Sequence, residues 1–308
     1  MTSFDRRSHP AGATFRSWKA PDGWVCRRME WPQPARRRPR GSLLFAAGRG
    51  DFIEKYLEAY AHWHAAGWAV TAFNWRGQGA SRAAGEEVDS LDILVGDLAA
   101  LLDEWRADAP GPHAAVGHSM GGHLLLRVLA EPRPGLDAAV LVAPMLAINA
   151  APLPGWGAAW TASLMSMVSP RGQPAWHEPA SAPPAGSLRQ AILTGSAERY
   201  EDEIWWWEKQ TDYQIGPPSW GWLDAAYRSI AQLTPAELAA VETPVLLIGA
   251  EKDRLVGPAA IRSAASSLPS SELLMFKESG HEILREADEI RLAAHEAILA
   301  FLDRHAPR

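Results

Sequence analysis

The segment Gly117-His118-Ser119-Met120-Gly121-Gly122 carries the strongest chemical signal in the sequence. An apolar strand, residues 114–116, precedes it, and a helical pattern with leucines on one side follows it. The pattern G-x-S-x-G between a strand and a helix is typical of a nucleophile elbow, a turn so tight that the serine adopts a strained backbone. Glycines on either side leave room for the strand and the helix to pass each other. We therefore predict that Ser119 projects as a nucleophile beside a helix amino terminus, whose N–H groups favour a developing anion.

A serine hydroxyl is a weak nucleophile at neutral pH, so it needs a base, and the base needs an orienting acid. In this strand–turn–helix setting the expected chain order is serine, acid, histidine. Asp253 follows a buried strand in PVLLIGAEKDRLV, and His281 follows the last predicted strand in LLMFKESGHEILRE. Glu251 is a rival acid in the same loop, but we favour Asp253 because apolar residues resume directly after it. The predicted triad is Ser119, Asp253 and His281.

Two backbone N–H groups should hold the oxyanion that forms when a serine attacks a carbonyl carbon. One belongs to the residue after the nucleophile, which is Met120 here. The other is expected in the turn after the first buried strand, at residues 47–51, where Arg49 is our candidate. Because only its backbone would act, a change of the Arg49 side chain would be a poor test of this role.

Strands and helices must alternate along the chain to place these residues together. Residues 14–18 and 24–31 flank Pro-Asp-Gly, a turn signal, and predict an antiparallel hairpin. Further strands are predicted at residues 42–47, 68–74, 114–116, 137–143, 244–249 and 272–276. Helices are predicted between them at residues 54–66, from Ser90 as N-cap onward, after Ser119, and at 287–305. This alternation predicts an α/β fold with a mostly parallel central sheet and helices on both faces.

The alternation stops in the middle of the chain, where residues 145–240 are rich in Pro, Gly, Ala and Trp. A loop of this length needs a function or structure of its own. We predict a cap or lid at 145–240, inserted between two parts of the core at 1–144 and 241–308, and lying over the carboxyl edge of the sheet.

Eight of the fifteen tryptophans fall in this predicted cap, including Trp205-Trp206-Trp207. Consecutive helical residues are about 100° apart around the axis, so these three rings cannot share one face. Either the helix is buried on several sides or a ring faces a groove or a lipid surface. We predict an apolar acyl-chain channel above Ser119 that docks on a bilayer, with Trp206, Trp220 and Trp222 as candidate substrate-binding residues.

Composition narrows the classes of partner. The formal net charge of −6 gives no indication of a nucleic-acid partner. The basic run at residues 34–40 is an exception to the overall negative charge. We interpret it as a solvated loop before a strand, and the alternative is a contact for anionic lipid headgroups. The sequence shows no clustered metal ligands and no phosphate-binding loop, so no metal or cofactor is implied.

The same sequence suggests a location. The lone cysteine, Cys26, fits a reducing compartment. Neither a signal-peptide core nor an uncharged apolar run of the length that spans a bilayer is present. We therefore expect a cytoplasmic protein, and the sequence leaves open a peripheral contact with the inner membrane face.

With these residues in hand, the chain resembles α/β-hydrolases of the monoacylglycerol lipase and bacterial lysophospholipase branch over residues 15–303. The likeness rests on GRGDFIEKY, FNWRGQGASR, the elbow, the positions of Asp253 and His281, and GPPSWGWL. GRGDFIEKY and GPPSWGWL are similar to the oxyanion segment and the cap of the bacterial lysophospholipases. Three features differ: Ala47-Gly48 stands where the monoacylglycerol lipases usually carry His-Gly, Asn74 replaces the usual acid of the branch, and the cap is unusually rich in Trp.

The resemblance implies a serine hydrolase that cleaves the carboxylic ester of a lipid with one acyl chain through an acyl-enzyme. The Ala-Gly oxyanion turn favours a lysophospholipase, and a monoacylglycerol lipase or small-ester carboxylesterase is the alternative. An aminopeptidase of the same fold would need acidic cap residues to bind a free amine, for which the candidates are Glu198, Glu201, Asp202 and Glu203. A non-catalytic hydrolase-fold binding protein is disfavoured by the intact order of serine, acid and histidine.

Overall fold

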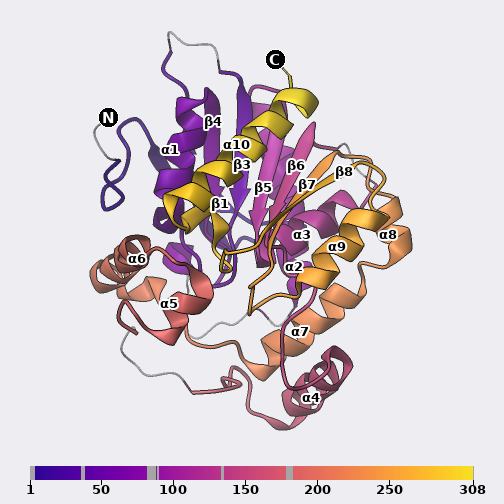
Figure 1. Cartoon of the computed structure of the whole chain (residues 1–308). Coiled ribbons are helices and arrows are strands. Elements are labelled where there is room, and N and C mark those ends of the chain that lie inside the picture. The colour runs from indigo at the N-terminus through magenta and orange to yellow at the C-terminus, as the bar shows by residue number, and fades with distance from the viewer. Residues whose placement is uncertain are drawn as a thin grey trace.

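In the computed structural model, which describes residues 4–35, 39–81, 88, 90–132, 135–177 and 183–307, eight strands form one sheet (Figure 1). Its strand order is β1-β2-β4-β3-β5-β6-β7-β8. The strands are β1 (Thr14–Lys19), β2 (Val25–Trp31), β3 (Gly41–Ala46), β4 (Trp68–Phe73), β5 (His113–His118), β6 (Ala138–Val142), β7 (Val245–Ala250) and β8 (Ser271–Phe276). Strands β1 and β2 form the predicted antiparallel hairpin, and β2 also pairs antiparallel with β4. All neighbours from β4 to β8 are parallel, which confirms the predicted mostly parallel sheet.

Helices cover both faces of the sheet, as the alternation of elements predicts. The core helices are α1 (Leu57–Ala65), α2 (Leu91–Asp108), α3 (Met120–Leu129), α9 (Pro258–Ser267) and α10 (Asp288–His305), with short 3-10 turns at η1 (Ile53–Tyr56), η2 (Gly79–Ser81) and η4 (Ile283–Arg285). Helices α1 and α10 lie on one face, and α2, α3 and α9 lie on the other (Figure 1). The strands β3, β6 and β7 are buried along their whole length, which explains their unbroken apolar runs.

The predicted helix start at Ser90 is confirmed, because the Ser90 side chain accepts a hydrogen bond from the Asp92 N–H. Three helices of the middle segment begin in the same way. Ser187, Ser196 and Ser219 each accept a hydrogen bond from a backbone N–H in the first turn that follows. Such caps satisfy donors that a helix amino terminus leaves unpaired.

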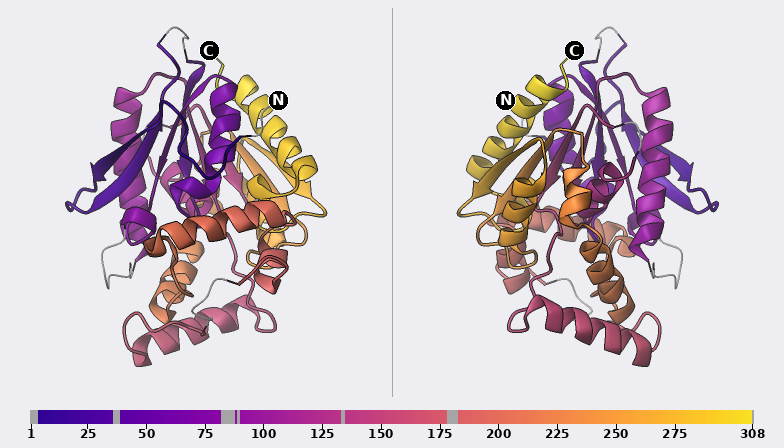
Figure 2. Two further views of the ribbon diagram at one scale, coloured as in Figure 1. Left: turned by 90° about the vertical axis from the view of Figure 1, so that its left-hand side faces the viewer. Right: turned by 90° about the vertical axis from the view of Figure 1, so that its right-hand side faces the viewer.

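Residues 145–240, which we call the cap, run between β6 and β7. Their helices are α4 (Gly155–Val168), α5 (Leu188–Leu193), α6 (Ala197–Lys209), η3 (Thr211–Tyr213), α7 (Trp220–Ala231) and α8 (Pro235–Ala239). Helices α4 to α7 lie beyond the carboxyl edge of the parallel strands, with α4 farthest from the sheet (Figure 2). Helix α4 packs against α7, and α8 packs against α9 of the core.

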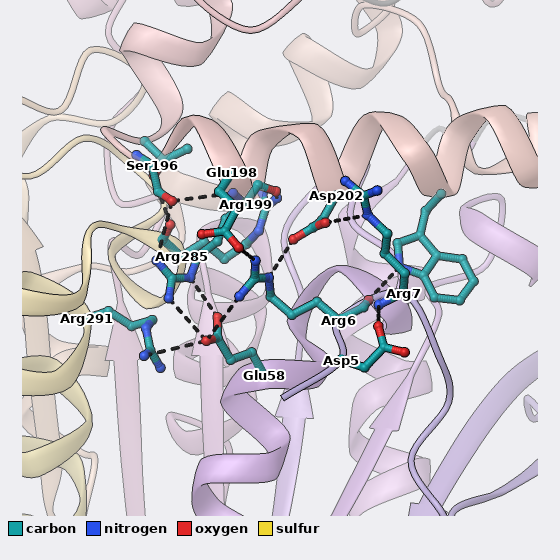
Figure 3. A network of polar contacts seen from close by, with 12 residues as sticks. Asp5, Arg6, Arg7, Glu58, Ser196, Glu198, Arg199, Asp202, Arg285 and Arg291 are labelled. Atoms are coloured by element: carbon teal, nitrogen blue, oxygen red, sulfur yellow. Dashed lines mark hydrogen bonds and ion pairs between the residues drawn. The ribbon is translucent and has the colours of Figure 1, made fainter. Parts of the chain in front are cut away.

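The chain before β1 binds the cap, which the sequence did not predict. Both Arg6 and Arg7 form ion pairs with Asp202 on α6, and Arg6 also pairs with Glu198 (Figure 3). The Nε1 of Trp206 donates a hydrogen bond to the carbonyl oxygen of Arg6 at 3.0 Å. This segment therefore covers one side of helix α6.

Three residues of the basic run at 34–40, Arg36–Arg38, lie outside the described residues. Arg40, at the amino end of β3, pairs with Asp303, and its guanidinium lies 5.2 Å from the Trp68 ring. The amino end of β3 is at the opposite edge of the sheet from the cap.

Candidate active site

Ser119 occupies the turn between β5 and α3 with φ 52° and ψ −117°, in the left-handed region that side chains rarely adopt. Besides the bond that its carbonyl accepts from the His123 N–H within the same helix, two backbone hydrogen bonds hold it there. Its N–H donates to the Val142 carbonyl, and its own carbonyl accepts from the Met145 N–H, both at 3.0 Å. The end of β6 therefore holds a strained serine at the carboxyl edge of the sheet, as expected for a nucleophile elbow.

The glycines of the elbow are required by close backbone contacts. A Cβ on Gly117 would lie 2.7 Å from the Gly121 carbonyl oxygen. A Cβ on Gly121 would lie 2.1 Å from the carbonyl oxygen of Ala46, at the end of β3. These distances show why the strand and the helix can pass each other only where side chains are absent.

Gly121→Ala is therefore expected to destabilise the protein by about 3 kcal/mol, because the added methyl group meets backbone atoms that cannot move aside. Gly96→Ala is the matched control, since Gly96 lies on α2 and a Cβ added there would meet none of the described residues within 4 Å. There alanine should stabilise the helix by up to about 1 kcal/mol. Urea unfolding followed by tryptophan fluorescence measures both, and equal stability of the two variants would contradict this account of the elbow.

Asp253 and His281 meet across the loops that follow β7 and β8. The Nδ1 of His281 lies 2.7 Å from Oδ2 of Asp253. The other carboxylate oxygen of Asp253 accepts the N–H groups of Leu255 and Val256 at 2.8 and 3.0 Å. Both side chains are buried, so the carboxylate is fixed while it orients the imidazole.

The pKa shifts of the pair agree with this geometry. Burial by itself raises the pKa of Asp253, but the His281 charge and three hydrogen bonds lower it below the ordinary value. Burial lowers the pKa of His281, but the carboxylates of Asp253, Glu282 and Asp51 together raise it, so the net pKa lies above 6.5. The arrangement thus favours an imidazole that can accept a proton beside a charged carboxylate.

The rival acid Glu251 is exposed and forms an ion pair with Arg262 on α9.

Ser119 and His281 line the same cavity, as do Met120 and Arg49, the two predicted oxyanion donors. The structure thus brings all five of the predicted residues Ser119, Asp253, His281, Met120 and Arg49 to one place.

The turn that contains Arg49 is held by side chains on both sides of that residue. The Gly48 N–H donates to Oδ2 of Asp51 at 2.8 Å, and the Gly50 N–H donates to Oε1 of Gln78 at 2.6 Å. The Arg49 side chain points toward the cap, where it donates to the Gly216 carbonyl and lies 5.1 Å from the Trp222 ring.

A buried ionic cluster lies behind this turn, and sequence reasoning missed it. Lys55 Nζ lies 2.7 Å from Oδ1 of Asp51, 2.6 Å from Oε1 of Glu282 and 3.3 Å from Oε2 of Glu203. Burial lowers the pKa of Lys55, but the three carboxylates raise it above the ordinary value, so the ammonium stays charged. The only hint in the sequence is Asp51 and Lys55 at i,i+4 spacing beside the predicted oxyanion turn.

His118, which directly precedes Ser119, joins the same cluster. Its Nδ1 lies 2.9 Å from the Tyr56 hydroxyl and 3.2 Å from Oδ2 of Asp51. Its Nε2 lies 3.4 Å from the His281 carbonyl oxygen. His118 thus contacts the turn of Arg49 and the loop of His281.

Core and cap together line an open cavity of about 500 Å³ above Ser119. This volume lies within the range of about 300–1,000 Å³ typical of small-molecule sites. The core side includes Ser119, Met120 and His281. The walls from the cap are mainly apolar and include Leu188, Ile192, Leu193, Trp207 and Trp222.

The candidate tryptophans separate in the structure. Trp222 lines the cavity, whereas Trp206 and Trp220 are not among the described residues that line it. Trp206 instead packs against the chain before β1, where it stacks on His9 with the ring centroids 5.5 Å apart. Trp207 and Trp176 line the cavity, and neither was a candidate. Helix α6 is therefore buried on several sides and also presents one ring, Trp207, to the cavity, so it combines the two arrangements that consecutive tryptophans allow.

The acidic residues considered for binding a free amine do not line the cavity. Glu198 and Asp202 pair with Arg6, and Asp202 also pairs with Arg7. Glu203 is buried among Lys55, Arg189 and Arg285, and Glu201 is exposed. The structure therefore gives no support to an amine subsite at these four residues.

Comparison with known proteins agrees with this architecture. Residues 37–288 match the family model described as serine aminopeptidase, S33. The chain is 29% identical to lysophospholipase L2 of Escherichia coli strain K12, over 85% of this chain and 80% of that protein. It is 25% identical to the monoacylglycerol lipase of Mycolicibacterium smegmatis, over 82% and 84% of the two chains.

Solved structures show the same fold. A soluble variant of the Saccharomyces cerevisiae monoglyceride lipase superposes with a TM-score of 0.75 at 17% identity, over 99% of this chain and all of that one. The match of the family model over most of the sequence, together with this fold, shows that the chain belongs to the serine aminopeptidase S33 family of α/β-hydrolase enzymes.

Proposed function

We propose that this enzyme hydrolyses the carboxylic ester of a lysophospholipid through Ser119, His281 and Asp253. The observation that carries the proposal is a single cavity with Ser119 and His281 on its core side and apolar cap residues around it. The names of the relatives, lysophospholipase and monoacylglycerol lipase, support a lipid ester as the substrate class.

In the proposed mechanism, Ser119 Oγ attacks the ester carbonyl carbon while His281 accepts its proton. Asp253 holds Nδ1 of His281, so that the other ring nitrogen faces the reacting atoms. The N–H groups of Met120 and Arg49 stabilise the oxyanion, and each such donor is worth about 3 kcal/mol in the transition state. His281 then protonates the leaving alcohol. In the second half of the reaction, water attacks the acyl-enzyme while His281 accepts its proton, and this proton passes to Ser119 Oγ as the fatty acid leaves.

The proposed substrate combines one acyl chain with a headgroup that carries a phosphate. The apolar cap wall suits the acyl chain, because each buried methylene contributes about 0.8 kcal/mol. The residues that line the cavity include Arg49, Lys55 and Arg189 as well as Asp51 and Glu282, so cationic residues outnumber acidic ones there and would attract a phosphate. This charge favours a lysophospholipid over a neutral monoacylglycerol.

A substrate panel tests this choice. Purified protein should release fatty acid from lysophosphatidylethanolamine with a higher kcat/KM than from a monoacylglycerol of the same acyl chain. Trp207→Ala, which removes part of the cap wall, should lower kcat/KM for both lipids by a larger factor than for a short p-nitrophenyl ester. A preference for the monoacylglycerol would replace the lysophospholipase assignment with that of a monoacylglycerol lipase.

The pKa shift of His281 predicts the pH dependence. A general base acts only when neutral, and the pKa of His281 is raised above 6.5 by Asp253, Glu282 and Asp51. We therefore expect kcat/KM for p-nitrophenyl butyrate to rise with pH through a limb centred above 6.5. A limb centred well below 6.5 in an enzyme that remains folded would contradict His281 as the base.

Helix α4 gives the cap an apolar outer surface. The exposed fractions of Trp156, Trp160, Met167 and Val168 are 80, 68, 74 and 68%, and α4 contains no charged residue. Among the described residues, no helix combines the length and apolar character needed to cross a bilayer. We propose that α4 lies on a membrane surface instead, where tryptophan is favoured. Trp176 and Leu188 are also exposed and line the cavity, so lipid could pass from the surface to Ser119.

Liposome flotation tests this contact. The wild type should float with vesicles, and Trp156→Ala combined with Trp160→Ala should lower the partition coefficient about tenfold or more, since burial of one large apolar side chain contributes about 1.5–3 kcal/mol. Leu292→Ser is the control, because Leu292 is an exposed leucine on α10, away from the cap. Equal flotation of the double variant and the wild type would contradict docking through α4.

A further inference from the structure

We propose that Lys55 is a positioning residue that couples the cap to the oxyanion turn and to the loop of the catalytic base. The inference rests on the proposed function, because it assigns a role within the same reaction. An ammonium group has three N–H donors, and Lys55 faces three carboxylates, one from each of three parts of the site.

The first carboxylate, Asp51, links Lys55 to the oxyanion turn. Its Oδ1 faces Lys55, and its Oδ2 accepts the Gly48 N–H at 2.8 Å. Gly48 directly precedes Arg49, whose N–H is the proposed oxyanion donor. A shift of the Asp51 carboxylate would therefore turn the peptide groups on which that donor depends.

The second carboxylate, Glu282, directly follows His281. Its Oε1 faces Lys55, and its backbone N–H donates to the Leu193 carbonyl at the end of cap helix α5 at 2.8 Å. The His281 N–H donates to the neighbouring carbonyl of Ile192 at 3.2 Å. The loop of the base is thus held by Lys55 on one side and by the cap backbone on the other.

The third carboxylate, Glu203, comes from cap helix α6 and is fully buried. One oxygen contacts Lys55 and Arg285, and the other lies 2.8 Å from Nη2 of Arg189 on α5. Without Lys55, Glu203 would keep Arg189 and Arg285, and Glu282 would keep Arg285. Among the described residues, Asp51 would keep only the Gly48 N–H, the Tyr56 hydroxyl and His118. Repulsion among the three carboxylates would move the oxyanion turn, the base loop and α6 apart, so that the position of the cap and the geometry of the reacting groups depend on one ammonium.

The test uses Lys55→Met, which keeps the length of the side chain and removes its charge. A displacement of about 1 Å can cost about 100-fold in rate, so we expect kcat for p-nitrophenyl acetate to fall about 100-fold with KM nearly unchanged. This short ester does not need the cap wall, so a fall in kcat reports the oxyanion turn and the base. Lys55→Arg, which restores the cation, should recover part of the lost kcat.

Arg199→Met is the matched control. Arg199 lies on α6, the helix that carries Glu203, and ties it to the core through Glu58 (Figure 3). It also pairs with Asp288, and it is not among the described residues that line the cavity. A general loosening of the cap would affect both variants alike, whereas we expect the kcat of Arg199→Met to stay at the wild-type value.

Each result leads to a distinct conclusion. A folded Lys55→Met with wild-type kcat and a wild-type rate of labelling by a fluorophosphonate probe would overturn the proposal, as would equal losses in Lys55→Met and Arg199→Met. If Lys55→Met does not fold, Glu203→Gln decides, and an unchanged kcat in that variant overturns the coupling to the cap. A wild type that folds and does not react with the probe would refute the proposed function itself.

Discussion

Ser119→Ala is expected to lower kcat for any ester substrate by about 10⁶-fold, the loss typical of removing a triad serine. The reason is that no other hydroxyl group is held at the strained turn, whose backbone the neighbouring strand fixes. The fold should persist, because alanine removes one oxygen atom and keeps the Cβ. Turnover and the urea unfolding midpoint, measured on the same preparation, separate loss of chemistry from loss of structure.

If folded Ser119→Ala retained more than trace activity, the nucleophile would have to be another residue. Ser279 provides the control. It is a buried serine two residues before His281, and its hydroxyl donates a hydrogen bond to the Gly280 carbonyl. Ser279→Ala should keep its turnover, so that the loss is specific to the elbow.

Asp253→Asn should lower kcat by about 10⁴-fold, because an amide in place of the carboxylate favours the wrong tautomer of the base. The substitution also removes the charge that raises the pKa of His281. The remaining activity should therefore reach its plateau at a lower pH than in the wild type. The pH profiles of kcat/KM for p-nitrophenyl butyrate measure both effects.

Glu251→Gln is the control for that substitution, because Glu251 is a carboxylate in the same loop that is exposed and paired with Arg262. It should leave the plateau and the pH limb unchanged. A large loss in Glu251→Gln with little loss in Asp253→Asn would exchange the roles of the two acids.

The strands and helices of the core, and the mostly parallel arrangement of its sheet, follow from local patterns in the sequence. Unbroken apolar runs predict strands that are buried on both faces of the sheet. The glycines around Ser119 predict a tight turn, and the close approach of Gly121 to the Ala46 carbonyl shows why glycine is needed there. The loops after β7 and β8 could be predicted to meet, since the carboxyl ends of parallel strands share one edge. Asp253 and His281 lie there because of that rule.

The cap could be predicted as a segment but not in its packing. Adjacent tryptophans on α6 point about 100° apart, and only tertiary contacts decide that Trp207 lines the cavity while Trp206 meets Arg6. The serine caps of α5, α6 and α7 were visible in the sequence and would have placed these helices.

Long-range ionic contacts lay beyond sequence reasoning for a related reason. Lys55 and Glu203 are 148 positions apart, and the charge of each residue would suit an exposed helix face equally well. Arg6 and Asp202 are also far apart in the chain. Nothing in the local pattern around such residues states which partner the fold brings to them.

The most direct test of the central claim is to react the wild-type protein with a fluorophosphonate and locate the adduct by mass spectrometry of its peptides. The account predicts one adduct per chain, on Ser119, which forms more slowly when lysophospholipid is present and is absent in Ser119→Ala. A folded protein with no adduct, or with its adduct on another residue, would contradict the claim that Ser119 is an activated nucleophile.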